Sequence, residues 1–309
     1  MSSNPSSTTK LRMVVTGRHG QVVSSLIKRA GSNDRFSVSA LGRPELDLSR
    51  PETIASAIAA AQPDIIVSAA AYTAVDQAET DETEATLVNG TAAGIIAKTA
   101  QSLGIPVIHI STDYVFDGSK TSPYVEADTV SPLGAYGRSK LAGERTVAEN
   151  NPNHVILRTA WVYSSVGKNF LKTMIRLAGT RETINVVADQ FGNPTSADDI
   201  ADGILTVAAN LVDSADPKLR GTFHMTGTGE ASWADFASEI FSVSKRLGGP
   251  NATVEKIPLS AYPTPAKRPE NSRLDCGLLK TIHNVALPDW KTSTAAVVAE
   301  LSDKHFAQD

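Results

Sequence analysis

The sequence predicts an α/β protein built on a doubly wound parallel sheet, with a smaller C-terminal substrate lobe. Short β-branched or apolar segments alternate with Ala-rich helical patterns over the first half of the chain, and two of these segments are almost continuously apolar. Alternating strands and helices form crossover units with parallel strands, and continuously apolar strands are typical of a sheet covered on both faces. A length of 309 residues accommodates one large domain with a smaller lobe.

The expected elements follow one another closely along the chain. Strands are expected at 11–16, 36–41, 64–68, 106–110 and 154–158, with helical patterns between them at about 20–31, 51–61, 85–103 and 133–149. Further on, we expect helices at 169–177 and 197–209 and strands at 183–187 and 221–225. Ser232 is expected to cap another helix, with Asp235 in its first turn. Five prolines between 248 and 273 indicate a loop-rich lobe, where ligand contacts are common.

These elements suggest how the chain is divided. Residues 1–10, rich in Ser, Thr and Asn, are expected to form a disordered tail. Residues 11–160 are expected to form a dinucleotide-binding domain, completed by sheet and helix contributions from about 183–225. Residues 161–182 and 226–309 are expected to form the substrate-binding lobe.

Composition excludes several functional classes. Lys and Arg number 29 and Asp and Glu 33, so the net charge of −4 provides no basic field for nucleic acid or for a membrane surface. The single cysteine, Cys276, cannot form an intrachain disulfide or a Cys-rich metal site, and the six histidines show no zinc-binding spacing. We therefore predict no metal. The chain has neither an apolar run of membrane-spanning length nor an apolar leader, so a cytoplasmic location is expected.

The first strand runs into a glycine-containing turn that opens a helix. Gly17 and Gly20 are three residues apart, and Val23 stands where a third glycine of a GxxGxxG pattern would fall. Glycines here allow backbone N–H groups to approach a pyrophosphate at the helix N-terminus. The alternative is an ordinary strand-to-helix turn. The position of the glycine loop in the first βα unit favours a Rossmann-like dinucleotide site.

The end of the second strand bears on the choice of cofactor. NAD-preferring enzymes usually carry an acidic residue there, whereas this chain has Gly42 followed by Arg43. Arg43, together with Arg18 in the glycine loop, favours the 2′-phosphate of NADPH, with NADH still possible. Asp47 and Leu48 are expected beside the adenine. The alternative is that Arg43 is a solvated residue of a turn.

A tyrosine and a lysine four residues apart provide the candidate catalytic pair. Tyr136 and Lys140 share one face of the helix after the fourth strand, and no other tyrosine has a lysine at this spacing. An ammonium favours the phenolate and lowers the pKa of a nearby tyrosine, so that the phenol can donate a proton to a carbonyl receiving a hydride. The alternative is a pair on an exposed helix surface.

With these motifs, the chain resembles the extended short-chain dehydrogenase/reductases, and within them the family of dTDP-4-dehydrorhamnose reductases. The similarity extends from residue 11 to about residue 290. It rests on GRHGQV at 17–22, AAAYTAVD at 69–76, STDYVF at 111–116, YGRSKLAGE at 136–144, RTAWVY at 158–163, DQFGNPT at 189–195 and RPENSRL at 268–274.

The resemblance implies a role for each matching position. Thr112 would hydrogen-bond the substrate carbonyl, Tyr136 would donate the proton, and Lys140 would assist it. The pyrophosphate would lie against Gly20, Gln21 and Val22, and the cofactor would be lined by Ala69, Ala70 and Ala71. Sugar contacts would come from Asp113 and Trp161, and contacts to the nucleotide end of the substrate from Arg268 and Asn271. The implied reaction is NADPH-dependent reduction of a dTDP-4-keto-6-deoxy sugar.

Other interpretations of these positions remain open. Trp161 could fill a core gap, Asp113 could form a turn, and Arg268 could be a solvated loop charge. Asn89 could bridge polar groups of the catalytic network or lie on a helix face. The chain departs from the family pattern at Ser68, often Asn, and at Val23.

Alternatives remain for the assembly and for the function. Some family members bridge a dimer through carboxylate-bound Mg²⁺, but this chain has Ser25 at a position that would supply a ligand. A homodimer is compatible with the resemblance. The functional alternatives that the resemblance leaves open are a related nucleotide-sugar reductase or epimerase, and a non-catalytic subunit of a methionine adenosyltransferase.

Overall fold

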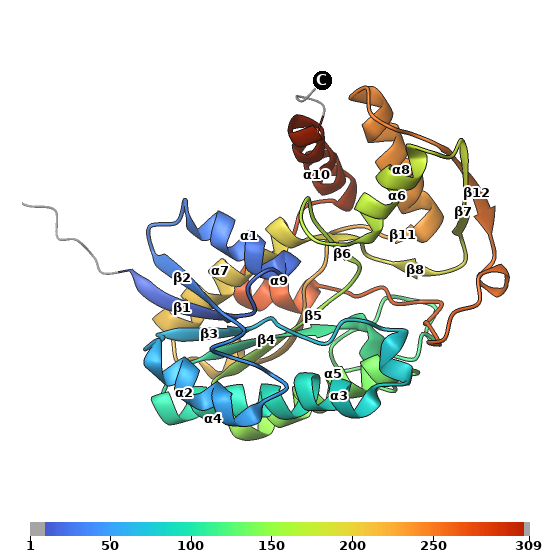
Figure 1. Ribbon diagram of the computed structural model, residues 1–309. Helices are drawn as coiled ribbons and strands as arrows, with labels where there is room; N and C mark the ends of the chain where they lie inside the picture. The colour runs from blue at the N-terminus through green and yellow to red at the C-terminus, as the bar shows by residue number, and fades with distance from the viewer. Residues whose placement is uncertain (1–9, 306–309) are drawn as a thin grey trace, which may run out of the picture.

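Parallel strands form the centre of the molecule. The computed structural model describes residues 10–305, so the expected tail lies outside the described residues except for Lys10. Within this range, the largest sheet has six strands in the order β10-β5-β4-β3-β1-β2, all parallel (Figure 1). Its strands are β1 (Leu11–Thr16), β2 (Phe36–Leu41), β3 (Ile65–Ser68), β4 (Val107–Thr112), β5 (His154–Thr159) and β10 (Gly221–His224).

The direction of winding reverses at one place in this sheet. The chain passes from β1 outward to β2 and then crosses to β3 on the other side of β1. Ligands of doubly wound sheets bind at the carboxyl ends of the strands beside such a reversal. The predicted fold class is therefore confirmed, and it places a ligand site beside the ends of β1 and β3.

Helices cover both faces of the sheet because its strands are apolar on both sides. Ile65 and Val67 of β3 pack in one cluster with α1 (Gln21–Ala30), α7 (Ala197–Asp213) and α9 (Gly277–His283). Ile66, between them, packs in the opposite cluster with α2 (Pro51–Ala60), α4 (Ala92–Leu103) and α5 (Ala135–Asn150). Successive side chains of a strand point to opposite faces, so this alternation fixes both layers.

The helix expected at 85–103 is interrupted. It begins as α3 (Glu82–Thr86), passes through a π-helical turn at Leu87–Thr91, and continues as α4. Asn89 lies buried in this turn, where its side-chain Oδ1 accepts from the Tyr72 N–H at 2.8 Å and its Nδ2 donates to the Tyr72 carbonyl at 3.0 Å. These tertiary hydrogen bonds are not visible in helical periodicity.

A separate group of helices forms the lobe, seen above and to the right of the sheet in Figure 1. The helices are α6 (Phe170–Ala178), α8 (Trp233–Arg246) and α10 (Trp290–His305), and α10 was not predicted. The expected cap of α8 is confirmed, since the Ser232 hydroxyl accepts from the Asp235 N–H at 3.1 Å. Apolar residues from all three helices share one core cluster, separate from the clusters on the main sheet.

Short strands complete the lobe. They pair as β6 (Val162–Tyr163) with β9 (Thr195–Ser196), β7 (Thr183–Val187) with β12 (Thr253–Ile257), and β8 (Phe191–Gly192) with β11 (Ala231–Ser232). The strand at 183–187 was expected to contribute to the main sheet, and this is wrong. Its partner β12 comes from the proline-rich segment, and Ile184 and Val186 face the core of the lobe. As expected, β10 pairs with β5 in the main sheet, and α7 packs against one face of that sheet.

Candidate active site

A cavity of about 840 Å³ opens at the carboxyl ends of β1, β3, β4 and β5, between the main sheet and the lobe. This is the position that the reversal between β1 and β3 predicts. The residues predicted for the site that line this cavity are Gly17, Gly20, Gln21, Val22, Ala69, Ala70, Ala71, Thr112, Asp113, Tyr136, Lys140 and Trp161.

The loop after β1 has the geometry that a dinucleotide requires. Gly17 has a φ of 100°, and a Cβ there would lie 3.3 Å from the Ala70 Cβ, so both the conformation and the close approach favour glycine. The Thr16 hydroxyl accepts from the N–H groups of Ala69 and Ala70, each at 3.1 Å, and joins this loop to the end of β3. The helix α1 begins without a side-chain cap or an acidic residue in its first turn. Its first N–H groups can therefore receive an anion such as a pyrophosphate.

The structure brings Tyr136 and Lys140 of α5 together at the cavity, as predicted. The Lys140 ammonium donates to the Ile110 carbonyl at 2.6 Å, and burial lowers its pKa to about 8. Burial also raises the pKa of Tyr136 to about 12, aided by the charge of Asp113 and opposed by a hydrogen bond with Thr112. The expected lowering of the Tyr136 pKa is wrong for this structure, because desolvation and the Asp113 charge raise that pKa by more than the hydrogen bond with Thr112 lowers it. Tyr136 is therefore a phenol, and a proton donor, at neutral pH.

The end of β4 presents two polar side chains to the cavity. The Thr112 hydroxyl donates to Asp113 Oδ1 at 2.9 Å and accepts from the Tyr114 N–H at 3.2 Å. Asp113 is buried, and this raises its pKa to about 6. Its Oδ2 is buried and has no hydrogen-bond partner among the described residues. A carboxylate oxygen without a partner beside a cavity is suited to a hydroxyl of a ligand.

Two tryptophans stack at the lobe side of the cavity. The rings of Trp161 and Trp233 are 3.5 Å apart between centroids and 5° from parallel. The Trp161 ring lies over Gly192, where a Cβ would be 2.5 Å from the ring. Trp161 therefore both packs in the lobe and lines the cavity. Sequence reasoning missed Trp233. The available sign was its place as the first residue of α8, directly after the cap Ser232, because the first turn of this helix lies at the cavity.

The cations expected to recognise a 2′-phosphate lie outside the cavity lining. Arg18 forms an ion pair with Glu45, and Arg43 is largely exposed, with its Nε 3.3 Å from Asp47 Oδ1. Leu48, expected beside the adenine, is buried in the core cluster of α2 and α4. The structure thus does not bring these residues to the cavity, although both arginines follow the ends of adjacent strands β1 and β2.

The two residues expected at the nucleotide end of the substrate differ in their surroundings. Arg268 lines a neighbouring cavity of about 610 Å³, which also shares Phe170 and Trp233 with the first. Its Nη2 donates to Asp76 Oδ2 at 2.9 Å, and its buried Nη1 has no partner in the described part of the chain. Asn271 lines neither cavity, because its amide donates to the carbonyls of two loop residues, Lys120 at 2.6 Å and Ser122 at 3.0 Å.

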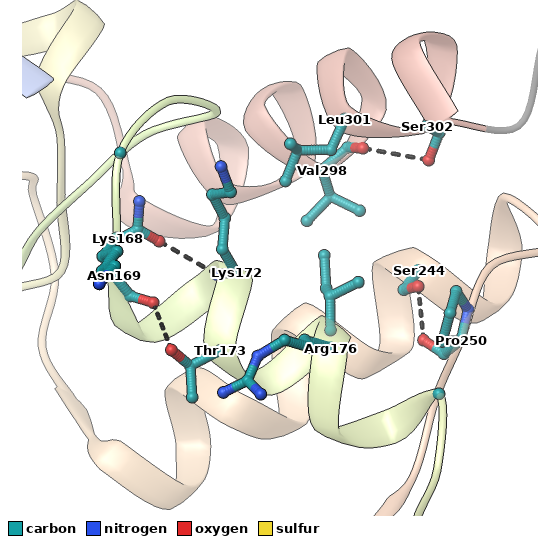
Figure 2. Close-up of a pocket in the computed structure, with 13 residues that line it drawn as sticks. Lys168, Asn169, Lys172, Thr173, Arg176, Ser244, Pro250, Val298, Leu301 and Ser302 are labelled. Carbon is teal, nitrogen blue, oxygen red and sulfur yellow. Dashed lines mark hydrogen bonds between the residues drawn. The ribbon is translucent and has the colours of Figure 1, made fainter. Parts of the chain in front are cut away.

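A third cavity, of about 830 Å³, lies between α6, α8 and α10 (Figure 2). Figure 2 shows Val298 and Leu301 of α10 across from α6. Gly167 and Lys168 line both this cavity and the first, and sequence reasoning missed both residues. Across residues 10–305, no cluster of His, Cys, Asp or Glu is arranged to hold a metal ion. Over the same range, no helix has the length and apolarity to cross a membrane.

Together, the dinucleotide loop, the buried Tyr–Lys pair and the Thr112 hydroxyl define an NAD(P)H-dependent oxidoreductase of the short-chain dehydrogenase/reductase type. Residues 11–303 match the family described as RmlD substrate binding domain. A protein from Sinorhizobium fredii named dTDP-4-dehydrorhamnose reductase is 51% identical over 288 residues, covering 93% of this chain and 97% of the relative. The chain therefore belongs to the dTDP-4-dehydrorhamnose reductase family.

Solved structures agree with this assignment. The dTDP-4-dehydrorhamnose reductase of Clostridium acetobutylicum has a TM-score of 0.87 and 36% identity, covering 94% of this chain and 100% of the other. The enzyme of the same name from Bacillus anthracis, solved in complex with NADP, has a TM-score of 0.86 and 33% identity with the same coverage.

Proposed function

We propose that this chain reduces the 4-keto group of dTDP-4-dehydro-L-rhamnose, with NADPH, to give dTDP-L-rhamnose. The observation that carries this proposal is the convergence of Thr112, Tyr136 and Lys140 on the cavity that the glycine loop also lines. Membership of the family supports the substrate, because the relatives carry the name of that reductase. A fold alone would not support it, since many activities share this architecture.

The cavity residues fit a nicotinamide dinucleotide. Gly17, Gly20 and Gln21 surround the uncapped start of α1, which would hold the pyrophosphate, and Lys140 would hold the nicotinamide ribose. When bound, the reduced nicotinamide supplies a hydride to the carbonyl carbon of the substrate. The ion pairs of Arg18 and Arg43 are at the surface, where such pairs contribute only about 0–1 kcal/mol, so both guanidiniums can turn to a 2′-phosphate. NADPH is therefore the preferred cofactor, and NADH is a weaker alternative.

The proton in this mechanism comes from Tyr136. Its phenol is protonated at neutral pH and donates to the carbonyl oxygen as that oxygen gains negative charge. The Thr112 hydroxyl, which donates to Asp113 Oδ1 in this structure, would rotate to donate its proton to the same substrate oxygen, and the Lys140 ammonium would stabilise the phenolate that remains. Hydride on carbon and proton on oxygen together convert the ketone into the alcohol.

The remaining side chains act on the rest of the substrate. The partnerless Oδ2 of Asp113 would accept from a sugar hydroxyl, and the ring of Trp161 would pack against the sugar. The Arg268 Nη1, buried without a partner among the described residues, would donate to the diphosphate. The cytoplasmic location and the homodimer stay predictions.

The deciding experiment supplies the purified protein with dTDP-4-dehydro-L-rhamnose and either NADPH or NADH. We expect stoichiometric oxidation of NADPH and a product carrying two additional hydrogens. An epimerase would convert the sugar without net consumption of the reduced cofactor. Absence of turnover, combined with co-purification of an adenosyltransferase, would favour the regulatory alternative and refute this proposal.

A further inference from the structure

A histidine lies directly behind the catalytic lysine. His109 of β4 is buried, and its Nε2 is 3.4 Å from Lys140 Nζ. On the other side of the ring, its Nδ1 is 3.1 Å from the hydroxyl of Ser68 at the end of β3. Lys140 lines the active-site cavity, whereas His109 and Ser68 do not. The three side chains therefore form a buried line that reaches the cavity at the ammonium.

Helix α5 approaches this line closely because it has a glycine there. A Cβ at Gly143 would lie 3.2 Å from His109 Nε2 and would overlap the Asn89 carbonyl oxygen. No side chain thus separates the imidazole from α5. The hydrogen bonds of Glu144, a carboxylate of the same helix, go elsewhere, since its oxygens accept from Arg158 at 2.7 and 2.9 Å and from Ser111, although its charge raises the pKa of Lys140.

The surroundings determine the protonation state of His109. Burial holds its pKa well below the usual range, and Lys140 and His154 lower that pKa further, so the imidazole is neutral. A neutral imidazole has one donor nitrogen and one acceptor nitrogen, whereas an ammonium can only donate. Nε2 is therefore the acceptor from Lys140, and Nδ1 carries the proton and donates to Ser68.

We propose that His109 is a positioning residue, which accepts one N–H of the Lys140 ammonium and directs its remaining N–H toward the cavity. The ammonium has three N–H groups, and the Ile110 carbonyl accepts another at 2.6 Å. With two N–H groups held inside the protein, the third faces the side on which Tyr136 and the cofactor site lie. The acceptor on His109 also favours the charged form of a lysine that burial would otherwise discharge. This inference rests on the proposed function for its catalytic consequence, but the hydrogen-bond arrangement is independent of substrate.

The first test requires no substrate. A long-range ¹H–¹⁵N spectrum of the protein labelled in histidine, assigned with His109→Leu, should show His109 as the neutral Nδ1–H tautomer around neutral pH. The Nε2–H tautomer or an imidazolium would overturn the proposal. A substrate that is not turned over would refute the proposed function and leave this result unaffected.

The second test measures NADPH affinity by fluorescence over a range of pH. In His109→Leu, the loss of affinity on the alkaline side should begin about one pH unit lower, which matches the loss of one hydrogen bond to a charged group. His109→Gln supplies an amide oxygen and should restore much of the wild-type profile. Ser68→Ala should shift it in the same direction by less, because the tautomer is then held less firmly.

A matched control separates this role from packing. His154→Gln removes a histidine of the adjacent strand β5 whose Nδ1 hydrogen-bonds the Asn151 carbonyl. It takes away a minor influence on the pKa of His109, which burial keeps neutral, so it should leave the profile unchanged. If His109→Leu lowers only the unfolding temperature and keeps the wild-type profile, His109 is structural and the proposal is wrong. If His109→Leu does not fold, an unshifted profile in Ser68→Ala leads to the same conclusion.

Discussion

Replacing Gly137 by alanine should move Tyr136, the proposed proton donor. Gly137 follows Tyr136 in the first turn of α5, and a Cβ there would overlap the Tyr114 carbonyl oxygen and lie 2.8 Å from the Pro132 Cβ. The obstructing oxygen belongs to the backbone two residues after Thr112 and cannot rotate away. The start of α5 must therefore move away from the end of β4, and the Tyr136 hydroxyl moves with it relative to Thr112.

The size of the effect follows from two opposing contributions. Alanine favours a helix over glycine by about 1 kcal/mol, whereas inserting a methyl group into a filled site costs about 1–3 kcal/mol. Because the overlap is with backbone, we take the upper part of that range and expect a net loss of about 2 kcal/mol in the free energy of unfolding. A displacement of roughly 1 Å between reacting groups lowers kcat by about 10²-fold.

The assay combines thermal unfolding with steady-state turnover of NADPH, and Gly203→Ala is the matched control. Gly203 lies within α7, away from the cavity, and a Cβ there would meet the flexible end of Met225 at 2.9 Å. That thioether can rotate, so the control should retain kcat and stability to within about 1 kcal/mol. If Gly137→Ala matches the control in both measurements, the close approach at Gly137 does not set the position of Tyr136.

Four further substitutions test individual roles. Tyr136→Phe should lower kcat by about 10²–10⁴-fold with little change in NADPH affinity, and near-wild-type kcat would exclude Tyr136 as the acid. Arg43→Ala should remove most of a preference for NADPH over NADH of about ten-fold or more in kcat/KM, and equal use of both cofactors by the wild type would contradict this. Arg268→Ala should raise KM for the sugar nucleotide several-fold and leave NADPH affinity unchanged in a fluorescence titration, and the reverse pattern would assign Arg268 to the cofactor. The pKa of Asp113 is raised from 3.8 to about 6, so the folded state favours the protonated carboxyl. The resulting stabilisation is fully present below pH 3.8 and is lost as the pH rises through about 6. Asp113→Asn should therefore raise the free energy of unfolding by about 1–3 kcal/mol near neutral pH and by little near pH ~4, and the same gain at both values would show another cause.

Local pattern was sufficient for the main sheet and for the placement of Tyr136 beside Lys140 at the cavity. The strand β3 is apolar at every position but its last, and this predicts a strand covered on both faces. Tyr136 and Lys140 are on one helix face because they are four residues apart, whatever the tertiary structure. The glycine loop is also local, since Gly17 and Gly20 directly follow the first strand and precede the first helix.

The tertiary structure alone decided which distant residues meet and how their chemistry is altered. The strand β12 pairs with β7 across about seventy residues, and Trp233 stacks on Trp161 over a similar separation. Sequence reasoning expected Lys140 to lower the pKa of Tyr136, but burial raises it. Desolvation depends on every atom that excludes water from a side chain, and those atoms come from several elements. The spacing of two residues on a helix and the apolarity of a strand are properties of residues close together in the sequence. Strand pairing, ring stacking and burial require the whole chain to have folded.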